Sequence, residues 1–234
     1  MKPIKKASEM SVKELAAYID HSVLKPEFTQ ADIRREIEKG IEYGCRTVCV
    51  NPCAMDLAME MTTDTYTKVC VVCDFPFGLS STESKVKQAE MLASKGVFEL
   101  DIVANIGYIK SGMWDEVLAD LKPVVDVCHK YGTAVKVIME SDALTVDEIK
   151  KVSEVIIQSG ADFIKTSTGF FTGGQNIGAA IEVIETIMEV NKDRCQIKGS
   201  GCIRTREHFL KLIDMGIDRM GVGFKSTPVV LGLE

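Results

Sequence analysis

Eight short apolar segments, rich in β-branched residues, recur along the chain and alternate with longer amphipathic segments. The longer segments have the period of a helix, as in 82–96, where Val86, Ala89, Leu92 and Ala93 share one face, and in 146–160. We expect strands over 18–23, 47–51, 68–75, 98–105, 134–140, 163–168, 196–201 and 219–224. Strands that alternate with helices predict a parallel sheet.

Eight such strand–helix units in 234 residues come close to the length of about 250 residues typical of a (β/α)₈ barrel. Glycines precede several of the expected strands, at 44, 96, 132, 160 and 216, where they would end the helices. The rival is an open, doubly wound sheet, but no G-x-G-x-x-G turn follows the first strand. We therefore predict an α/β fold, a single-domain TIM barrel over residues 1–234, because no linker or shift in composition marks a boundary.

The net charge of −6 gives no sign of attraction to nucleic acid or to a membrane surface. Lys2, Lys5 and Lys6 precede no apolar region of the kind a secretory signal needs, and no apolar run is long enough to cross a bilayer. These features predict a cytoplasmic protein without nucleic-acid or membrane partners.

Eight cysteines raise two alternatives. Cys45, Cys49 and Cys53 are four residues apart, and Cys70 and Cys73 have thioredoxin-like spacing, which would suit zinc or redox chemistry. However, no histidine lies near these pairs, and the inner cysteines fall in apolar, strand-like runs. We therefore favour free, buried cysteines that act as small apolar side chains, with no metal site and no disulfides.

In a (β/α)₈ barrel the active site is built at the carboxyl ends of the strands. Most residues of the expected strands are apolar, so the polar ones in or just after them are informative. They are Asp20, His21, Asn51, Asp74, Asp101, Asn105, Lys136, Glu140, Lys165 and Lys198.

Lys165 and Lys198 occupy the same place in the sixth and seventh strands, and hydroxyl residues and glycine follow each. If both point inward, the neighbouring charge and partial loss of water would each lower a lysine pKa. A partly neutral lysine attacks carbonyl carbons and forms Schiff bases. Asp101 could pair with one ammonium, move protons, or both. The alternative is a set of buried ion pairs that only joins strands, but two lysines in register favour catalysis.

Glycine clusters follow three adjacent strands, where barrels often bind phosphate through backbone N–H groups. The clusters are TGFFTGGQ after the sixth strand, GSGCIRT after the seventh and GVGFKST after the eighth. Together they predict a phosphate site.

Six motifs, in order along nearly the whole chain, resemble those of the deoxyribose-phosphate aldolases. They are IDHSVLKP, VCVNP, FELDIVANIG, VKVIMES, IKTSTGF and IKGSGCIRT. The resemblance implies a class I aldolase on a (β/α)₈ barrel. Such an enzyme reversibly cleaves 2-deoxy-D-ribose 5-phosphate to acetaldehyde and glyceraldehyde 3-phosphate without metal or other cofactor. It further implies nucleoside catabolism and a homodimer or homotetramer.

The resemblance also assigns roles to residues. Lys165 is then the Schiff-base lysine, Lys198 the second lysine that lowers its pKa, and Asp101 the acid that relays protons through water. Asp20, Ser22, Cys49 and Thr168 match residues near the substrate, although plain core packing is an equal alternative for Cys49. The phosphate would be held at Gly169, Gly201, Cys202, Gly221 and Gly223.

Two departures from the family pattern concern the phosphate. Cys202 stands where the family usually has a second glycine, and Gly223 and Phe224 fall where it usually has serines. Either Lys225, Ser226 and Thr227 supply replacement donors, or Phe224 narrows the site and selects an unphosphorylated or different aldehyde. A barrel that only binds a sugar phosphate is a third hypothesis, but it leaves the lysines and Asp101 without a role.

Overall fold

The computed structural model describes residues 3–234. Within that range, parallel strands form a closed barrel in which their order follows the sequence from β1 to β8. The strands are β1 (Ile19–Val23), β2 (Thr47–Val50), β3 (Lys68–Cys73), β4 (Glu99–Val103), β5 (Ala134–Ile138), β6 (Phe163–Lys165), β7 (Gln196–Ser200) and β8 (Arg219–Gly223). The predicted (β/α)₈ fold is confirmed.

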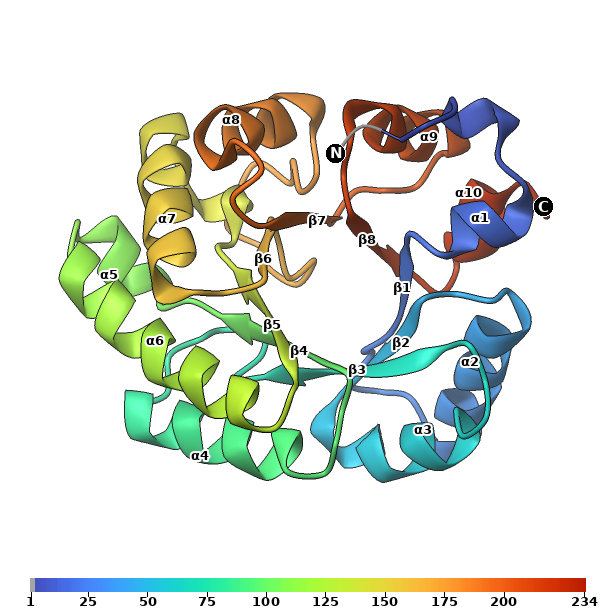
Figure 1. Ribbon diagram of the computed structural model, residues 1–234, viewed down its shortest axis with the longest axis horizontal. Coiled ribbons are helices and arrows are strands. Elements are labelled where there is room, and N and C mark those ends of the chain that lie inside the picture. Colours follow the sequence, from blue (N-terminus) through green and yellow to red (C-terminus); the bar gives the residue numbers. More distant parts are fainter. Residues whose placement is uncertain (1–2) are drawn as a thin grey trace. The chain divides into compact units, whose positions relative to one another are not determined.

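Helices connect successive strands, and their labels are those of Figure 1. The α-helices are α1 (Val12–Ala16), α2 (Gln30–Glu42), α3 (Met55–Met61), α4 (Thr82–Ala93), α5 (Ile106–Lys110), α6 (Trp114–Lys130), α7 (Val146–Ser159), α8 (Ile181–Asn191), α9 (Arg206–Met215) and α10 (Thr227–Leu231). Short 3₁₀ turns are η1 (Ala7–Glu9), η2 (Pro52–Ala54) and η3 (Ser141–Ala143).

The contacts within the chain define two compact units. The first unit runs up to Val71 and includes Ile203–Glu234, and the second is Val72–Cys202. In the first unit, β1 pairs with β2 on one side and with β8 on the other. A single domain over residues 1–234 stays a prediction.

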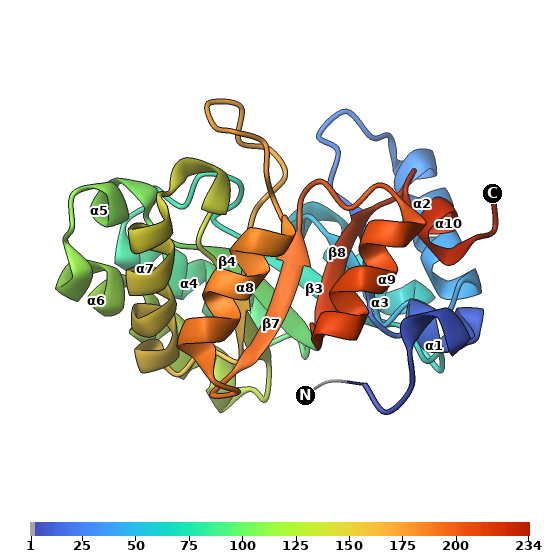
Figure 2. The same cartoon turned by 90° about the horizontal axis from the view of Figure 1, so that it is seen from above.

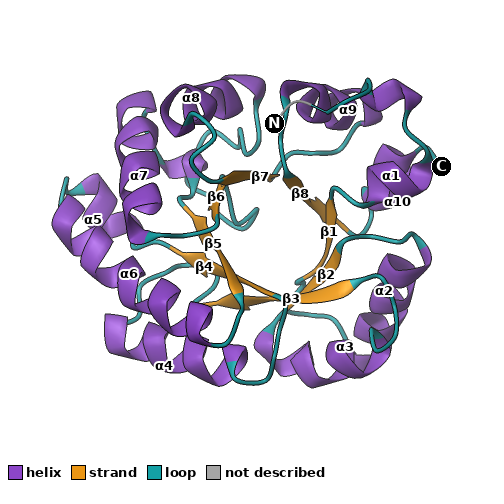
Figure 3. Cartoon of the chain, viewed as in Figure 1, coloured by secondary structure: helices purple, strands orange, loops and turns teal. Residues whose placement is uncertain are grey.

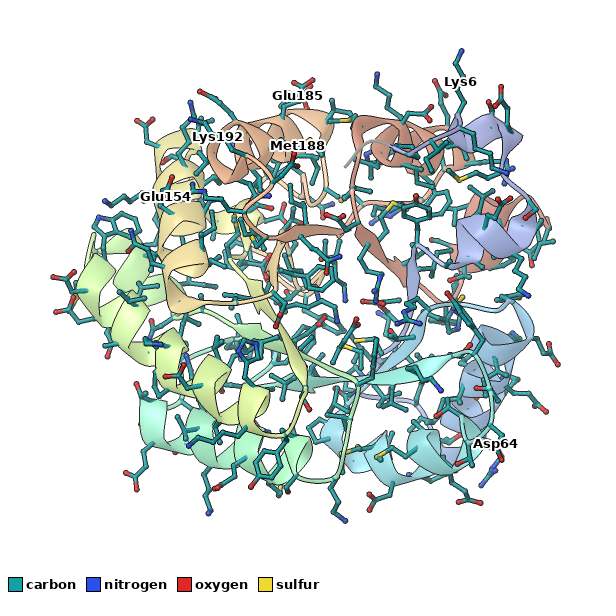
Figure 4. All side chains as sticks on the ribbon, in the orientation of Figure 1. Lys6, Asp64, Glu154, Glu185, Met188 and Lys192 are labelled. Carbon is teal, nitrogen blue, oxygen red and sulfur yellow. The ribbon has the colours of Figure 1, made fainter. Side chains whose placement is uncertain are left out.

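The second unit contains β4 to β7, with α4, α6, α7 and α8 on their outer side (Figure 3). All five residues of β4 are buried, as expected for a strand covered on both faces. Figure 4 labels Glu154 on α7 and Glu185 on α8, whose side chains point away from the strands. An ion pair of 2.6 Å joins Nη2 of Arg194, in the turn after α8, to Oε1 of Glu154 on α7.

The ends of the helix α7 lie where the sequence predicts them. Thr145 and Glu148 form a capping box at its start, and Gly160 ends it with a left-handed φ of 84°. That backbone conformation strains a residue with a Cβ, so glycine is the natural stop.

The helix α4 differs from the expectation in one respect. Ala89, Leu92 and Ala93 are buried as predicted, but Val86 is only half-buried and the fully buried neighbour is Lys85. Lys85 Nζ lies 2.5 Å from Oδ2 of Asp120 on α6, and this ion pair makes its burial tolerable. Apolar periodicity cannot detect a charged side chain whose partner is 35 residues away.

The sixth strand is also shorter than predicted, because β6 ends at Lys165. Beyond it, hydroxyl side chains add to the backbone hydrogen bonds of Thr166 with Lys198 and Ser141. Thr166 Oγ1 donates to the carbonyl of Ser200 (2.8 Å), and the N–H of Ser167 donates to Ser200 Oγ (3.3 Å). The chain then leaves the strand and forms a loop that projects beyond β6 and β7 in Figure 2.

Candidate active site

Lys165 and Lys198 are Cα partners across the β6–β7 pair. The ammonium of each donates to the same oxygen of Asp101, Oδ2, at 2.7 Å. Asp101 and Lys198 are fully buried, and Lys165 is 3% exposed. The structure therefore brings together, in the second unit, the three residues that the sequence singles out for catalysis.

A third lysine, Lys136, completes this cluster. Lys136 on β5 is the Cα partner of Asp101 on β4, and its ammonium lies 2.9 Å from Oδ1 of Asp101. Its second partner is Oε2 of Glu99, at 2.7 Å. Lys136 and Glu99 are both buried. Lys136, Lys165, Lys198, Glu99 and Asp101 are called the lysine cluster below.

Sequence reasoning counted Lys136 among the polar strand residues but gave it no role, and it missed Glu99. A usable signal was present. Glu99 and Asp101 are two residues apart on one strand, so their side chains point to the same face. Two acids on one buried face need cationic partners, and Lys136 lies on the next strand along the chain.

The lysine cluster keeps Asp101 ionised. Burial raises the pKa of the Asp101 carboxyl, but the charges of Lys136, Lys165 and Lys198 outweigh it and hold that pKa well below its usual range. With every member ionised, the five side chains carry three positive and two negative charges.

A second polar group follows β5 and β6. The buried carboxylate of Glu140 accepts hydrogen bonds from the N–H of Thr168 (3.2 Å to Oε2) and from its hydroxyl. The N–H of Phe170 donates to Thr168 Oγ1 (3.0 Å). The Thr168 hydroxyl is therefore engaged on both sides, and Gly169 between these contacts has a left-handed φ of 78°.

Gly201 and Cys202 lie directly after β7, against the loop that leads to α8. A Cβ at Gly178 would lie 2.5 Å from the carbonyl of Gly201, so the two backbones touch. Cys202 has a left-handed φ of 60°, and its thiol donates to the carbonyl of Asn176 (3.0 Å). Left-handed backbone at a residue with a Cβ costs about 1–2 kcal/mol, and the resembling family usually has glycine there.

In the first unit, Asp20, Ser22 and Cys49 lie on adjacent strands. Asp20 is fully buried, and its Oδ1 accepts hydrogen bonds from Thr47 Oγ1 (2.8 Å) and Arg219 Nη1 (2.7 Å). Ser22 is the Cα partner of Cys49 on β2. Their expected part in substrate binding stays a prediction.

Gly221 and Gly223 on β8 are the Cα partners of Asp20 and Ser22. Next to them, Phe224 packs edge-on against Phe28, with ring centroids 5.0 Å apart. Of the three replacement donors, Thr227 is fully buried and its Oγ1 lies 2.8 Å from His21 Nδ1. Thr227 is therefore committed to the interior, whereas Lys225 is exposed and Ser226 is half-buried.

The cysteines are all free thiols. Burial raises the pKa of Cys45 and Cys73, and it raises that of Cys128 to about 12. Cys45, Cys49, Cys70, Cys73 and Cys128 are buried small side chains, as predicted. The prediction is wrong for Cys53, which is exposed, and Cys195 and Cys202 are half-buried.

An apolar cavity of about 380 Å³ lies in the second unit. The segments after β3, β4 and β6 line it, with Phe77, Leu79, Ile106, Phe170 and Phe171 among its residues. Because each segment follows the carboxyl end of a strand, the cavity is at the end of the strands where (β/α)₈ barrels build active sites.

The fold is a (β/α)₈ barrel, and its buried lysines are grouped around one carboxylate. Together these features define a class of proteins, the (β/α)₈-barrel enzymes whose site contains lysines. The profile of the DeoC/LacD family aldolases matches residues 15–226. The chain therefore belongs to the DeoC/LacD family of aldolases, which are lyases.

Known relatives agree with this assignment. A deoxyribose-phosphate aldolase of Desulfitobacterium hafniense is 38% identical over 212 residues, which cover 91% of this chain and 95% of the relative. The solved structure of QR15, an aldolase, is 37% identical and has a TM-score of 0.85, with 94% of this chain and 96% of that chain covered. A tetrameric deoxyribose phosphate aldolase from Aeropyrum pernix is 27% identical, with a TM-score of 0.84, and the match covers 95% of this chain and 91% of that chain.

Among the described residues, none of the helices has the length and apolar character to span a membrane.

Proposed function

We propose that this protein reversibly cleaves 2-deoxy-D-ribose 5-phosphate to acetaldehyde and D-glyceraldehyde 3-phosphate through a Schiff base on Lys165. The lysine cluster is the observation that carries the proposal. It holds three amines and one shared carboxylate out of water, and Lys165 is the only one of the three lysines with any exposed surface. The substrate is the one named by the curated relatives.

The first chemical step is attack by the neutral amine of Lys165 on the C1 aldehyde carbon of the open-chain sugar. The resulting carbinolamine takes up a proton and loses water to give an iminium ion. Removal of the proton from the C3 hydroxyl then breaks the C2–C3 bond, whose electron pair moves into the iminium. Glyceraldehyde 3-phosphate leaves, and the enamine that remains is protonated at C2 and hydrolysed to acetaldehyde.

The other members of the lysine cluster serve this sequence. Lys136 and Lys198 share the carboxylate of Asp101 with Lys165, so all three amines lie around one acid. Asp101 stays ionised and lies 2.7 Å from Lys165 Nζ. Its position next to the amine suits a relay of protons through water as the carbinolamine forms and loses its hydroxyl.

One observation favours a second candidate, a related class I aldolase with an unphosphorylated or different acceptor aldehyde. The ring of Phe224 occupies a position where the family usually has a serine, and it packs on Phe28. Lys225 Nζ lies 5.7 Å from the Phe224 ring centroid, and its charge could replace the serine donors in binding a phosphate. The Schiff-base chemistry is the same in both candidates.

Trapping the imine tests the mechanism. The protein is incubated with acetaldehyde and reduced with borohydride, and peptides are mapped by mass spectrometry. We expect an ethyl adduct on Lys165 and none in Lys165→Met. Lys85 is a matched internal control, because it is equally buried but lies on α4. An unmodified Lys165 would contradict the Schiff-base mechanism.

Comparing two substrates tests the phosphate. We expect turnover of 2-deoxyribose 5-phosphate with a higher kcat/KM than that of 2-deoxyribose. A preference for the free sugar would support the second candidate instead. Activity should be unchanged by EDTA, since no step of the mechanism uses a metal, and a large loss would revive a metal site.

The remaining expectations concern the cell and the assembly. We propose a single-domain cytoplasmic enzyme of nucleoside catabolism that forms a homodimer or homotetramer. The tetrameric relative from Aeropyrum pernix supports an assembly of this kind. Light scattering during gel filtration would measure the mass in solution, and a monomer would contradict the proposal.

A further inference from the structure

The loop between β6 and α8 is held near both ends by carboxylates of one short segment. That segment follows β5 and contains Glu140 and Asp142. Neither residue belongs to the lysine cluster, and both are buried. The loop itself is mostly exposed between residues 169 and 176 and projects beyond the strands in Figure 2. An exposed loop is thus anchored near both ends by the buried carboxyl groups of Glu140 and Asp142.

Glu140 holds the start of the loop. Its carboxylate accepts hydrogen bonds from the backbone and from the hydroxyl of Thr168, three residues after Lys165. Thr168 Oγ1 accepts in turn from the N–H of Phe170. These contacts lie on both sides of Gly169, whose backbone has a left-handed φ of 78°. Hydrogen bonds to an ionised carboxylate are stronger than those between neutral groups.

Asp142 holds the end of the loop. Its Oδ1 accepts from the N–H groups of Ile177 (2.5 Å) and Gly178 (2.9 Å). Its Oδ2 accepts from Ser167 Oγ (3.0 Å). Gly178 in turn touches the backbone of Gly201 after β7. Asp142 therefore joins the two ends of the loop to each other and to the backbone that follows β7.

The backbone of Glu140 is strained. Glu140 has a φ of 59° and a ψ of 65°, in the left-handed region that a glutamate rarely adopts. Such a conformation is strained and persists only where the surroundings enforce it. A glycine would adopt it freely but would carry no carboxylate. The strain thus accompanies a side chain that is aimed at Thr168.

We propose that Glu140 is a positioning residue for phosphate recognition, which acts through Thr168 to present the backbone amide of Gly169 to the phosphate group of the substrate. The inference rests on the proposed function, because it concerns how that same site takes its phosphorylated substrate. Glu140 does not touch the reacting atoms. Its effect falls on the binding of the phosphorylated substrate and leaves imine formation at Lys165 intact.

A double-mutant cycle tests this role with Glu140→Gln, Thr168→Val and the combined variant. We expect KM for 2-deoxyribose 5-phosphate to rise by about tenfold or more in each single variant, because each variant loses one charge-assisted hydrogen bond. The combined variant should be little worse than either single one, because both remove the same contact. Borohydride trapping of acetaldehyde on Lys165 and the KM for unphosphorylated 2-deoxyribose should change by less than about threefold.

Glu148→Gln is the matched control. Glu148 caps the nearby helix α7 and pairs with Lys110, without contact to the loop, so its KM for both substrates should equal that of the wild type. Amide exchange of residues 168–170 provides a readout that needs no turnover. It should accelerate in Glu140→Gln and stay unchanged in Glu148→Gln.

The outcomes separate this inference from the proposed function. If the wild type neither traps acetaldehyde nor cleaves either sugar, the proposed function fails, and phosphate recognition in that reaction fails with it. If the wild type prefers the phosphorylated sugar but Glu140→Gln retains that preference and the exchange rates, only the role of Glu140 is overturned. Equal losses of imine trapping and of turnover on both sugars would indicate a merely structural role and would also overturn it.

Discussion

Lys136 binds Oδ1 of Asp101, with its Nζ at 2.9 Å. Lys165 and Lys198 share the opposite oxygen. Both oxygens of the carboxylate therefore contact lysine ammonium groups, which restrict its rotation. A carboxylate held in this way changes its orientation little, which would preorganise Asp101 for the proton relay proposed for it.

Lys136→Met should destabilise the protein by about 3 kcal/mol or more, because it leaves the buried Glu99 without its 2.7 Å partner. Urea unfolding measures the loss. Adding Glu99→Gln should restore part of the stability, since the unpaired charge is then removed. The control Lys150→Met breaks an exposed ion pair with Glu189 and should cost less than about 1 kcal/mol. Equal losses for the two lysines would refute this account.

Asp101→Asn should lower kcat by about 10²–10⁴-fold, the usual contribution of a group that moves protons. The asparagine has a similar shape but carries no carboxylate to relay protons, and it removes one negative charge from beside three ammonium groups. Steady-state assays with 2-deoxyribose 5-phosphate measure the effect. A variant that keeps more than about a third of the wild-type kcat would exclude Asp101 from the proton relay.

Lys85→Met should destabilise the protein without changing kcat per folded molecule. Lys85 is fully buried on α4, and its contacts are structural, with Asp120 at 2.5 Å and Asp74 at 3.7 Å. We expect a loss of about 3–5 kcal/mol in the free energy of unfolding, because Asp120 is left buried and unpaired. Unfolding curves and activity are measured on the same preparation. A fall in kcat at full folding would mean that Lys85 acts in catalysis.

His21 should make stability depend on pH between about 6.5 and 4. Burial, assisted by the charge of Lys39, lowers the pKa of His21 to about 4, while the unfolded chain takes up this proton near pH 6.5. The unfolded state therefore binds more protons in that window, and stability falls as the pH drops through it, by up to about 3 kcal/mol. Unfolding of the wild type and of His21→Gln at several pH values isolates the effect. Parallel pH curves would contradict it.

Asp142→Asn should loosen the loop between β6 and α8. The amide that replaces one carboxylate oxygen is a donor, so it cannot serve Ser167 Oγ and the N–H groups of Ile177 and Gly178 equally well. We expect chymotrypsin to cut after Phe170 or Phe171 at least about tenfold faster than in the wild type, since cleavage follows the population of the open loop. The control Asp147→Asn, in the first turn of α7, should leave the cleavage rate unchanged.

Much of the fold was predictable because it is written in local patterns. Apolar segments with β-branched residues mark every strand, and Gly160 marks the end of α7. The predictions fail where contacts of particular side chains, and not the local apolar pattern, decide the structure. The strand β6 ends at Lys165, and the hydroxyl of Thr166 and the N–H of Ser167 then donate hydrogen bonds to Ser200 on β7. Lys85 lies on the buried face of α4 because it pairs there with Asp120.

The sequence by itself determined the barrel class and the register of two lysines, since strands six and seven repeat one motif and period-two geometry aligns its members. It also identified Asp101 as the acid on a neighbouring part of the sheet. Only the tertiary structure decided which charges meet. Lys136 and Glu99 join the cluster, and Glu140 reaches Thr168, through contacts between residues 28 to 37 positions apart in the chain. Such pairings depend on which strands are neighbours and where the chain leaves each strand, and no local pattern encodes that.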